Sequence, residues 1–172
     1  FISAQDLLNE VDKDPIRFMM LNRSNDVELD FDFDKVKEKT KDNPVFYVQY
    51  AFARINSLLR SLNINLDSQF KLNTKNLDLN TNEEKIIRKV FEWPKIIESS
   101  SKKFEPHKIP FYLYELSTLF HAYWSRGNDD KKYKFIENDK IKRIEILSIV
   151  KLVAVVIKNG MKILGVSLPK KM

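Results

Sequence analysis

The 172-residue sequence contains 43% hydrophobic and 31% charged residues, a balance that fits a folded globular protein and excludes a disordered chain. Its formal net charge of +6 favours acidic partners, among them nucleic-acid phosphates and anionic lipid headgroups. The absence of cysteine excludes disulfides and thiolate metal sites, and two histidines are too few for a histidine-based metal cluster.

The first 34 residues predict a small connector of helical and extended segments. Ser3 is expected to cap a first helix. Asp14 and Pro15 predict the start of a second, because Asp can cap and Pro suits the first helical position. Apolar and acidic residues alternate strictly over residues 29–34, which predicts a short extended segment rather than a catalytic pair of carboxylates. The last of these aspartates, Asp34, is expected to cap the helix that follows.

Residues 35–172 predict a helical bundle. Pro44 begins a long helix to about Leu62, and the stretch after it, rich in Asn, Asp, Ser and Thr, predicts an irregular connection. The expected elements that follow are a helix over 81–93 capped by Thr81 or Asn82, one or two turns over 95–104, a helix over 111–126, a loop at 127–130, and a last helix from about 139 to Gly160 or Gly165.

The longest apolar run, Ile144–Ile157, is interrupted by charge and is too short to span a bilayer, so we expect a buried core helix there. The predicted fold class is therefore all-α: a helical bundle over 35–172, preceded by a helical and extended connector over 1–34.

The helix that begins at Pro44 has two distinct faces when its side chains are placed about 100° apart. One is an ordinary apolar core face. The other carries Tyr47, Tyr50 and Arg54, which together pair flat aromatic rings with a guanidinium. That combination suits unpaired bases, since a base offers a π-face and its phosphate a charge. The alternative, which periodicity alone favours, is that both tyrosines are boundary residues with their hydroxyls in water.

The helix over 111–126 has two apolar stripes, one more than a single core contact needs. Phe120 and Trp124, at i and i+4, are expected side by side on the second stripe, which suits helix packing, a domain interface or a stacking platform. His121 is interpreted as a structural residue. A basic cluster follows, either a solvated surface or a set of phosphate contacts: Lys131, Lys132, Lys134, Lys140, Lys142 and Arg143.

The sequence shows no catalytic site and no metal site. It has no recognisable nucleophile spacing, no Gly-rich phosphate loop and no metal-ligand spacing. Three glycines in the whole chain also argue against a nucleotide fold of strands and tight turns.

Four segments, in the same order and spacing, resemble the arginyl-tRNA synthetase family over essentially the whole chain. Asp14–Arg17 resembles the DALR signature in its D-x-x-R form, and Phe31–Asp34 resembles the FDxD stretch that follows it. Asn43–Arg54 resembles the NPxxYxQYAHAR segment, and Lys158–Met172 resembles the KNGLxLLGI…PxxM tail. The DALR pattern recurs in related synthetases, whereas the central segment together with the tail is specific to arginyl enzymes. Phe52 replaces the usual His of the motif, and we expect it at the edge of the core.

The resemblance implies the α-helical anticodon-binding domain of a class I synthetase, an ATP-dependent arginine-tRNA ligase. The chain would bind the anticodon loop of arginine tRNA. ATP and magnesium would belong to a catalytic domain whose HIGH-like and KMSK-like motifs are not in this sequence. The chain alone is expected to hold no cofactor, to catalyse nothing, and to be a cytoplasmic monomer that docks on its own catalytic domain and not on a membrane. By motif position, the family's anticodon contacts fall on Tyr47, Tyr50, Arg54, Phe120, Trp124 and Met172.

Two other functions stay open at this point. A helical protein-interaction module would use the extra aromatic stripes to dock a partner domain. A stand-alone enzyme would reveal itself by aminoacylation with the chain alone.

Overall fold

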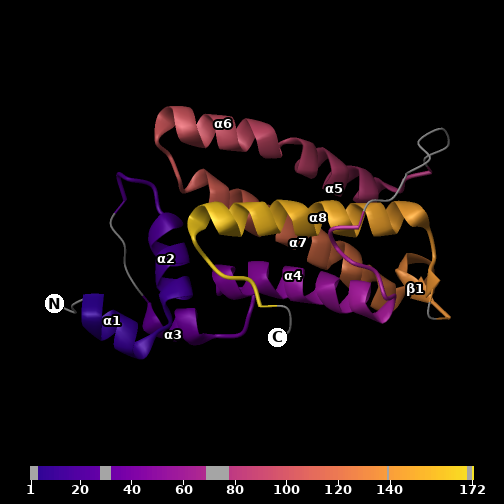
Figure 1. Ribbon diagram of the computed structural model, residues 1–172, viewed down its shortest axis with the longest axis horizontal. Helices are drawn as coiled ribbons and strands as arrows, with labels where there is room; N and C mark the ends of the chain where they lie inside the picture. The colour runs from indigo at the N-terminus through magenta and orange to yellow at the C-terminus, as the bar shows by residue number, and fades with distance from the viewer. Residues whose placement is uncertain (1–3, 28–31, 69–77, 139, 170–171) are drawn as a thin grey trace.

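The computed structural model describes residues 4–27, 32–68, 78–138, 140–169 and 172 (Figure 1). Within these ranges the fold is α-helical apart from one two-stranded hairpin, so the predicted fold class is confirmed. The elements are α1 Ala4–Glu10, α2 Lys13–Leu21, α3 Phe33–Lys37, α4 Pro44–Ser61, α5 Thr81–Phe91, α6 Trp93–Lys103, α7 Lys108–Asp129, the 3-10 helix η1 Lys131–Tyr133, β1 Ile136–Glu137, β2 Lys140–Ile141 and α8 Ile144–Leu164.

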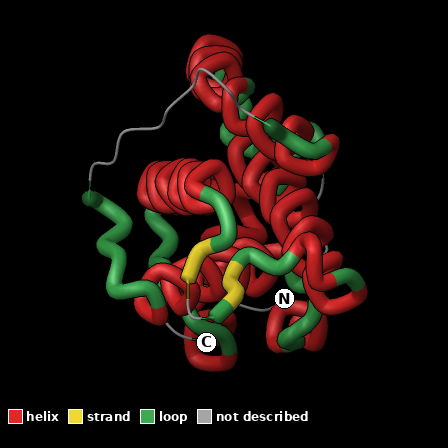
Figure 2. Tube along the Cα trace, turned by 90° about the vertical axis from the view of Figure 1, so that its right-hand side faces the viewer, coloured by secondary structure: helices red, strands yellow, loops and turns green. Residues whose placement is uncertain are grey.

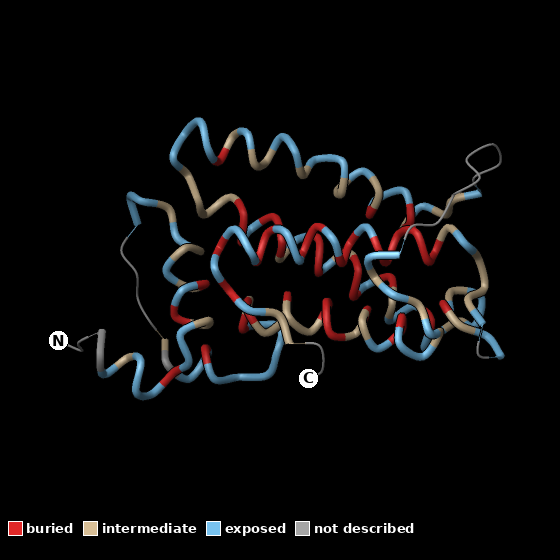
Figure 3. The backbone as a smooth tube through the Cα atoms, in the orientation of Figure 1, coloured by how far each residue is buried: buried red, intermediate tan, exposed pale blue. Residues whose placement is uncertain are grey.

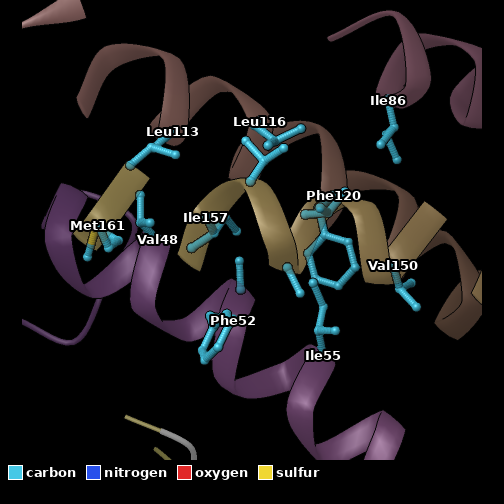
Figure 4. Packing of buried hydrophobic residues seen from close by; sticks show 14 of the residues in the cluster. Val48, Phe52, Ile55, Ile86, Leu113, Leu116, Phe120, Val150, Ile157 and Met161 are labelled. Atoms are coloured by element: carbon cyan, nitrogen blue, oxygen red, sulfur yellow. The ribbon is translucent and has the colours of Figure 1, made fainter. Parts of the chain in front are cut away.

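Four helices build the bundle: α7 and α8 contact each other, and both contact α4 and α5. Figure 2 looks along the bundle and shows the hairpin at its near end. The residues buried between the helices lie on their facing sides (Figure 3). Figure 4 shows the core from close by, with Val48, Phe52 and Ile55 of α4, Ile86 of α5, Leu113, Leu116 and Phe120 of α7, and Val150, Ile157 and Met161 of α8. Phe52 is 6% exposed, in agreement with its expected place at the core.

The start of α4 is set by a buried asparagine. The Asn43 side-chain oxygen accepts from the Phe46 backbone N–H at 3.3 Å, and Pro44 takes the first helical position. The Asn43 amide nitrogen donates to the carbonyls of Val36 and Glu38 at 2.7 and 2.9 Å, which ties the chain before the helix to its cap. The predicted helix is confirmed to within one residue at its end.

The apolar run near the C-terminus is a core helix, as predicted, since more than half of α8 is buried. Its one buried lysine, Lys151, donates to the carbonyl of Asn65 at 3.1 Å and to the hydroxyl of Ser68 at 3.0 Å. That charge therefore lies against polar groups of the connection after α4. Among the described helices, none combines the length and apolar character that crossing a bilayer requires.

The N-terminal helices differ from the prediction in their caps. Asp12, and not Asp14, stands at the N-cap of α2, so Asp14 lies in the first turn of the helix. Asp32, and not Asp34, caps α3 by accepting from the backbone N–H groups of Asp34 and Lys35. The expected cap Ser3 and residues 29–31 of the alternating segment lie outside the described residues, and the end of that segment is helical rather than extended, since α3 begins at Phe33.

A small apolar cluster separate from the main core joins Val11 and Ile16 of the connector to Val36 of α3. Phe18 of α2 belongs instead to the main core and is fully buried. The connector is thus packed on the bundle through α2, and the boundary at residue 34 stays a prediction.

The middle helices differ from the prediction: α5 is shorter than expected and ends at Phe91 rather than Trp93, whereas α6 is longer. Asn80 caps α5 in a capping box with Glu83, one residue before the expected cap. The segment predicted to form one or two turns is the 11-residue helix α6, because Pro94 stands near its start, where proline is compatible with a helix.

The loop predicted at residues 127–130 is wrong over most of its length, since α7 continues to Asp129. A Cβ at Gly127 would lie 3.2 Å from the Tyr133 carbonyl oxygen, so this glycine permits the next segment to pack closely against the helix. The hairpin pairs Ile136 with Ile141, and α8 therefore begins at Ile144 rather than near residue 139. The longer of the two expected ends is the observed one, with Gly165 in the left-handed conformation after α8.

Candidate nucleic-acid interface

A row of flat groups runs along α4 and onto α7, and we name Phe46, Tyr50, Arg54 and Trp124 the aromatic column. The rings of Phe46 and Tyr50 are 5.7 Å apart with their planes 11° from parallel. The Arg54 guanidinium lies 4.4 Å from the Tyr50 ring centroid and 5.2 Å from that of Trp124. The three α4 residues are spaced by four, which places them on one side of the helix. All four side chains are half-buried, so each keeps an accessible part.

His121 of α7 lies beneath this column and orients it. Its Nε2 donates to the Tyr47 carbonyl oxygen at 3.2 Å, because a carbonyl can only accept. Its Nδ1 then accepts from Arg54 Nη1 at 3.4 Å, and Arg54 Nη2 donates to the Tyr50 hydroxyl at 2.6 Å. Arg54 is thus fixed by a neutral imidazole on one side and a phenol on the other.

The environment of His121 keeps the imidazole neutral. Burial and the neighbouring Arg54 charge lower the pKa of His121 to about 4, outweighing the opposing effect of the Tyr47 carbonyl. The prediction that His121 is structural and not a base agrees with this geometry.

Tyr47 lies on the flank of the column rather than within it. Its ring is 4.4 Å from that of His121 and 5.4 Å from that of Tyr114. Burial raises the pKa of the Tyr47 phenol. The structure therefore brings Tyr47, Tyr50 and Arg54 together around His121. Helical periodicity predicts that these three α4 residues share one face.

Trp124 forms the far end of the column and is supported from below. Its ring is 5.7 Å from Phe120 and 5.1 Å from Phe135, the latter edge-on. Phe120 lies beside Trp124, as its spacing predicts, but it is fully buried and offers no open face to a base here. Phe135, from the segment before the hairpin, packs against both Phe120 and Trp124.

A cleft of about 190 Å³ opens beside Trp124. Its lining combines apolar walls with an amide and an ammonium group: Leu58, Trp124, Gly127, Asn128, Lys134, Phe135 and Ile136. Of the basic cluster, in which Lys131, Lys132 and Lys134 are the possible phosphate contacts, only Lys134 lines this cleft. Lys131 and Lys132 are exposed on the adjoining η1, with Lys132 paired to Asp130 at 3.2 Å.

Arg143, at the edge of the same basic cluster, is directed away from the cleft. Its guanidinium donates to Glu83 at 2.8 Å, and Glu83 is fully buried. The Tyr123 hydroxyl donates to the other Glu83 oxygen at 2.5 Å, so Arg143 belongs to a structural network.

Met172 ends the tail that follows α8 and is 53% exposed. Upstream, the tail is bound to α4, where the Gln49 amide donates to the Ser167 carbonyl at 3.0 Å. Residues 170–171 lie outside the described residues, and contact of Met172 with the column stays a prediction.

Three members of this site were missed from the sequence: Phe46, His121 and Phe135. Phe46 precedes Tyr50 by four residues, so helical spacing could have found it. Phe135 and His121 meet partners far along the chain, and no local pattern predicts those contacts.

The chain belongs to the DALR anticodon binding domain family, whose model matches residues 48–172. It is 50% identical over 172 residues to an arginine–tRNA ligase of Pelagibacter ubique and 42% identical over 179 residues to one of Agrobacterium fabrum. All of this chain is matched in both cases, but only 30% of either relative, so the chain spans about a third of their length. The resemblance to arginyl-tRNA synthetases drawn from the motifs is confirmed.

Two solved structures share the fold. A putative arginyl-tRNA synthetase from Campylobacter jejuni superposes with a TM-score of 0.84 at 24% identity, over all of this chain and 36% of that one. The arginyl-tRNA synthetase from Thermus thermophilus gives a TM-score of 0.71 at 21% identity, over 92% of this chain and 26% of that one.

Proposed function

We propose that this chain reads the anticodon loop of arginine tRNA as one domain of an arginine–tRNA ligase. The observation that carries the proposal is the aromatic column, in which the Arg54 guanidinium is held between the rings of Tyr50 and Trp124 on the surface of a packed bundle. The family and the ligases that match the whole chain support the same function.

The column suits bases that have left their helical stack. An unpaired base can stack on the accessible part of Trp124 or Tyr50, and one such contact contributes about 1–3 kcal/mol. Arg54 keeps donors beyond the ones bound to Tyr50 and His121 for a base edge or a phosphate. Lys134, at the rim of the cleft, is placed to meet the backbone of a nucleotide whose base lies against Trp124.

The remaining parts of the reaction would lie in the rest of the ligase. A catalytic domain would bind ATP and magnesium and attach arginine, while this chain supplies recognition without a cofactor, as part of a monomeric cytoplasmic enzyme. The exposed apolar side chains of Leu8, Met20 and Val27, on and after the N-terminal helices, support docking of the connector on that domain.

A titration tests the proposal. A labelled anticodon stem-loop of arginine tRNA and a copy with an altered anticodon are titrated with the chain at two salt concentrations. We expect tighter binding of the arginine sequence and weaker binding of both at high salt, because phosphate contacts release counterions. Trp124→Ala should weaken binding by about 1–3 kcal/mol, since it removes one stacking surface.

Trp93→Ala is the matched control, because Trp93 packs on Tyr112 at the start of α6, away from the column. Equal affinity for both stem-loops together with an unchanged affinity of folded Trp124→Ala would refute the proposal. No RNA binding at low salt would favour the protein-interaction module instead.

A further inference from the structure

The two charged residues of the D-x-x-R motif bind the chain where α8 ends, Arg17 at the last residue of the helix and Asp14 three residues beyond it. The Asp14 carboxylate accepts from the Ser167 backbone N–H at 3.0 Å and also from the Ser167 hydroxyl. One turn later, Arg17 Nε donates to the carbonyl of Leu164, the last residue of α8. These contacts join positions about 150 residues apart in sequence, so they connect the connector to the C-terminal tail.

Gly165 lies between those two contacts and is adapted to them. Its φ of +68° lets the chain turn sharply out of α8. A Cβ at this position would approach Arg17 Nε to 2.7 Å, so a side chain would push the guanidinium away from the helix end. The absence of a side chain at Gly165 therefore leaves the space that the Arg17 guanidinium occupies at the end of α8.

Beyond the turn, the tail is directed across α4. Ser167 is held on three sides, since Gln49 binds its carbonyl and Asp14 its N–H and hydroxyl. Leu168 packs against the main core. Figure 1 shows the yellow tail leaving α8 and crossing α4 near its N-terminal half, the half that carries Tyr50.

We infer that Asp14 and Arg17 are positioning residues for RNA binding, which hold the start of the C-terminal tail, residues 164–168, beside α4 and so limit the positions from which Met172 meets the bound anticodon loop. We name the contacts of Asp14, Arg17 and Gln49 with the tail the tail latch. The inference rests on the proposed function for its RNA half, whereas the latch itself can be measured without RNA. In this inference Asp14 and Arg17 contact the tail and do not contact the RNA themselves.

The latch has a physical advantage for binding. A free tail would lose conformational entropy when Met172 contacts RNA, whereas a tail already held at Ser167 has lost the part that belongs to residues 165–168. The same contacts link α2, next to the expected catalytic domain, to the RNA-binding end of the chain.

The first measurement is hydrogen exchange of the Ser167 amide, resolved by NMR in the free chain. Asp14→Ala should speed this exchange about tenfold, the factor that corresponds to losing one hydrogen bond to a charged group. Asp14→Asn should recover part of the protection, because its amide oxygen still accepts. Asp12→Ala is the matched control, because Asp12 is exposed, belongs to the same helix and makes no capping bond.

The second measurement is affinity for the anticodon stem-loop in a double-mutant cycle. Asp14→Ala and deletion of Met172 should each weaken binding, and the two together should weaken it no more than the deletion alone. If Asp14→Ala fails to fold, Ser167→Ala replaces it, because this variant removes only a hydroxyl of the tail and leaves α2 intact. It too should weaken binding alone and add no further loss to the deletion of Met172.

The outcomes separate the two proposals. Unchanged exchange at Ser167 in a folded Asp14→Ala chain overturns the latch. Equal losses of affinity with and without Met172 also overturn it, because the substitution would then act through the fold. A wild-type chain that binds no stem-loop overturns the proposed function, and with it the RNA role of the tail, while the exchange data still report whether the latch exists.

Discussion

Protonation of His121 should destabilise the fold, and the structure gives the sign and size of the effect. The imidazole is buried, and its Nδ1 accepts from the Arg54 guanidinium. Adding a proton at Nδ1 would remove that hydrogen bond and place two positive charges side by side. The pKa of His121 in the folded chain is accordingly lowered to about 4, from an ordinary value of 6.5.

The sign follows from which state binds the proton first as the pH falls. The unfolded chain takes it up near pH 6.5, whereas the folded chain resists it until about pH 4. The contribution of neutral His121 to stability is therefore complete above pH 6.5 and is lost as the pH falls from 6.5 to 4. A difference of this size corresponds to about 3 kcal/mol over the whole window.

Urea unfolding at several pH values between 7 and 4.5 measures this loss. The variant His121→Gln keeps a donor for the Tyr47 carbonyl and an acceptor for Arg54 but does not titrate, so its stability should vary much less over the window. Carboxylates that titrate near pH 4 affect both chains alike and cancel in the comparison. His107→Gln, at the other histidine, should keep the wild-type dependence. Parallel curves for wild type and His121→Gln would refute this account of the site.

Two further predictions concern the core. Tyr123→Phe leaves one oxygen of the buried Glu83 carboxylate without its donor, so the free energy of unfolding in urea should fall by about 2 kcal/mol. Tyr114→Phe, which removes an exposed hydroxyl, is the control and should change it little. Equal losses in the two variants would contradict the prediction. Gly160→Ala places a Cβ 2.8 Å from the Leu113 methyl groups and should destabilise the chain by about 1–3 kcal/mol in the same assay. Trimming Leu113 to Val in the Gly160→Ala chain should then recover stability, and a further loss would show that crowding is not the cause.

The parts of the fold that could be predicted are those whose determinants are local. The boundaries of α4 follow from a capping residue, a proline at the first helical position and an unbroken apolar stripe, all within one segment. The buried character of α8 follows from its composition alone. The end of α7 could not be predicted in this way, because Gly127 and the residues after it have the local composition of a loop. That glycine stays helical since the 131–134 segment folds back onto it, a tertiary contact.

The same distinction between local and tertiary determinants applies to the residues of the site. Helical spacing brings Tyr50 and Arg54 together, and the structure agrees. Phe120 is buried in the main core and also contacts Phe135, which arrives from beyond α7, so the spacing with Trp124 predicted adjacency but not exposure. His121 contacts Tyr47 and Arg54 from another helix, and a single histidine has no pattern that would reveal such partners.

These contacts also explain how the residues of the proposed interface can lie on core helices. On α4, Tyr50 and Arg54 are one helical turn apart and half-buried, while Ile55, about 100° round the helix from Arg54, is fully buried in the main core. The accessible groups are therefore fixed by the same packing that stabilises the bundle, and Trp124 is fixed by the rings below it. A base that stacks on them orders few protein side chains, so more of the stacking free energy is retained as affinity.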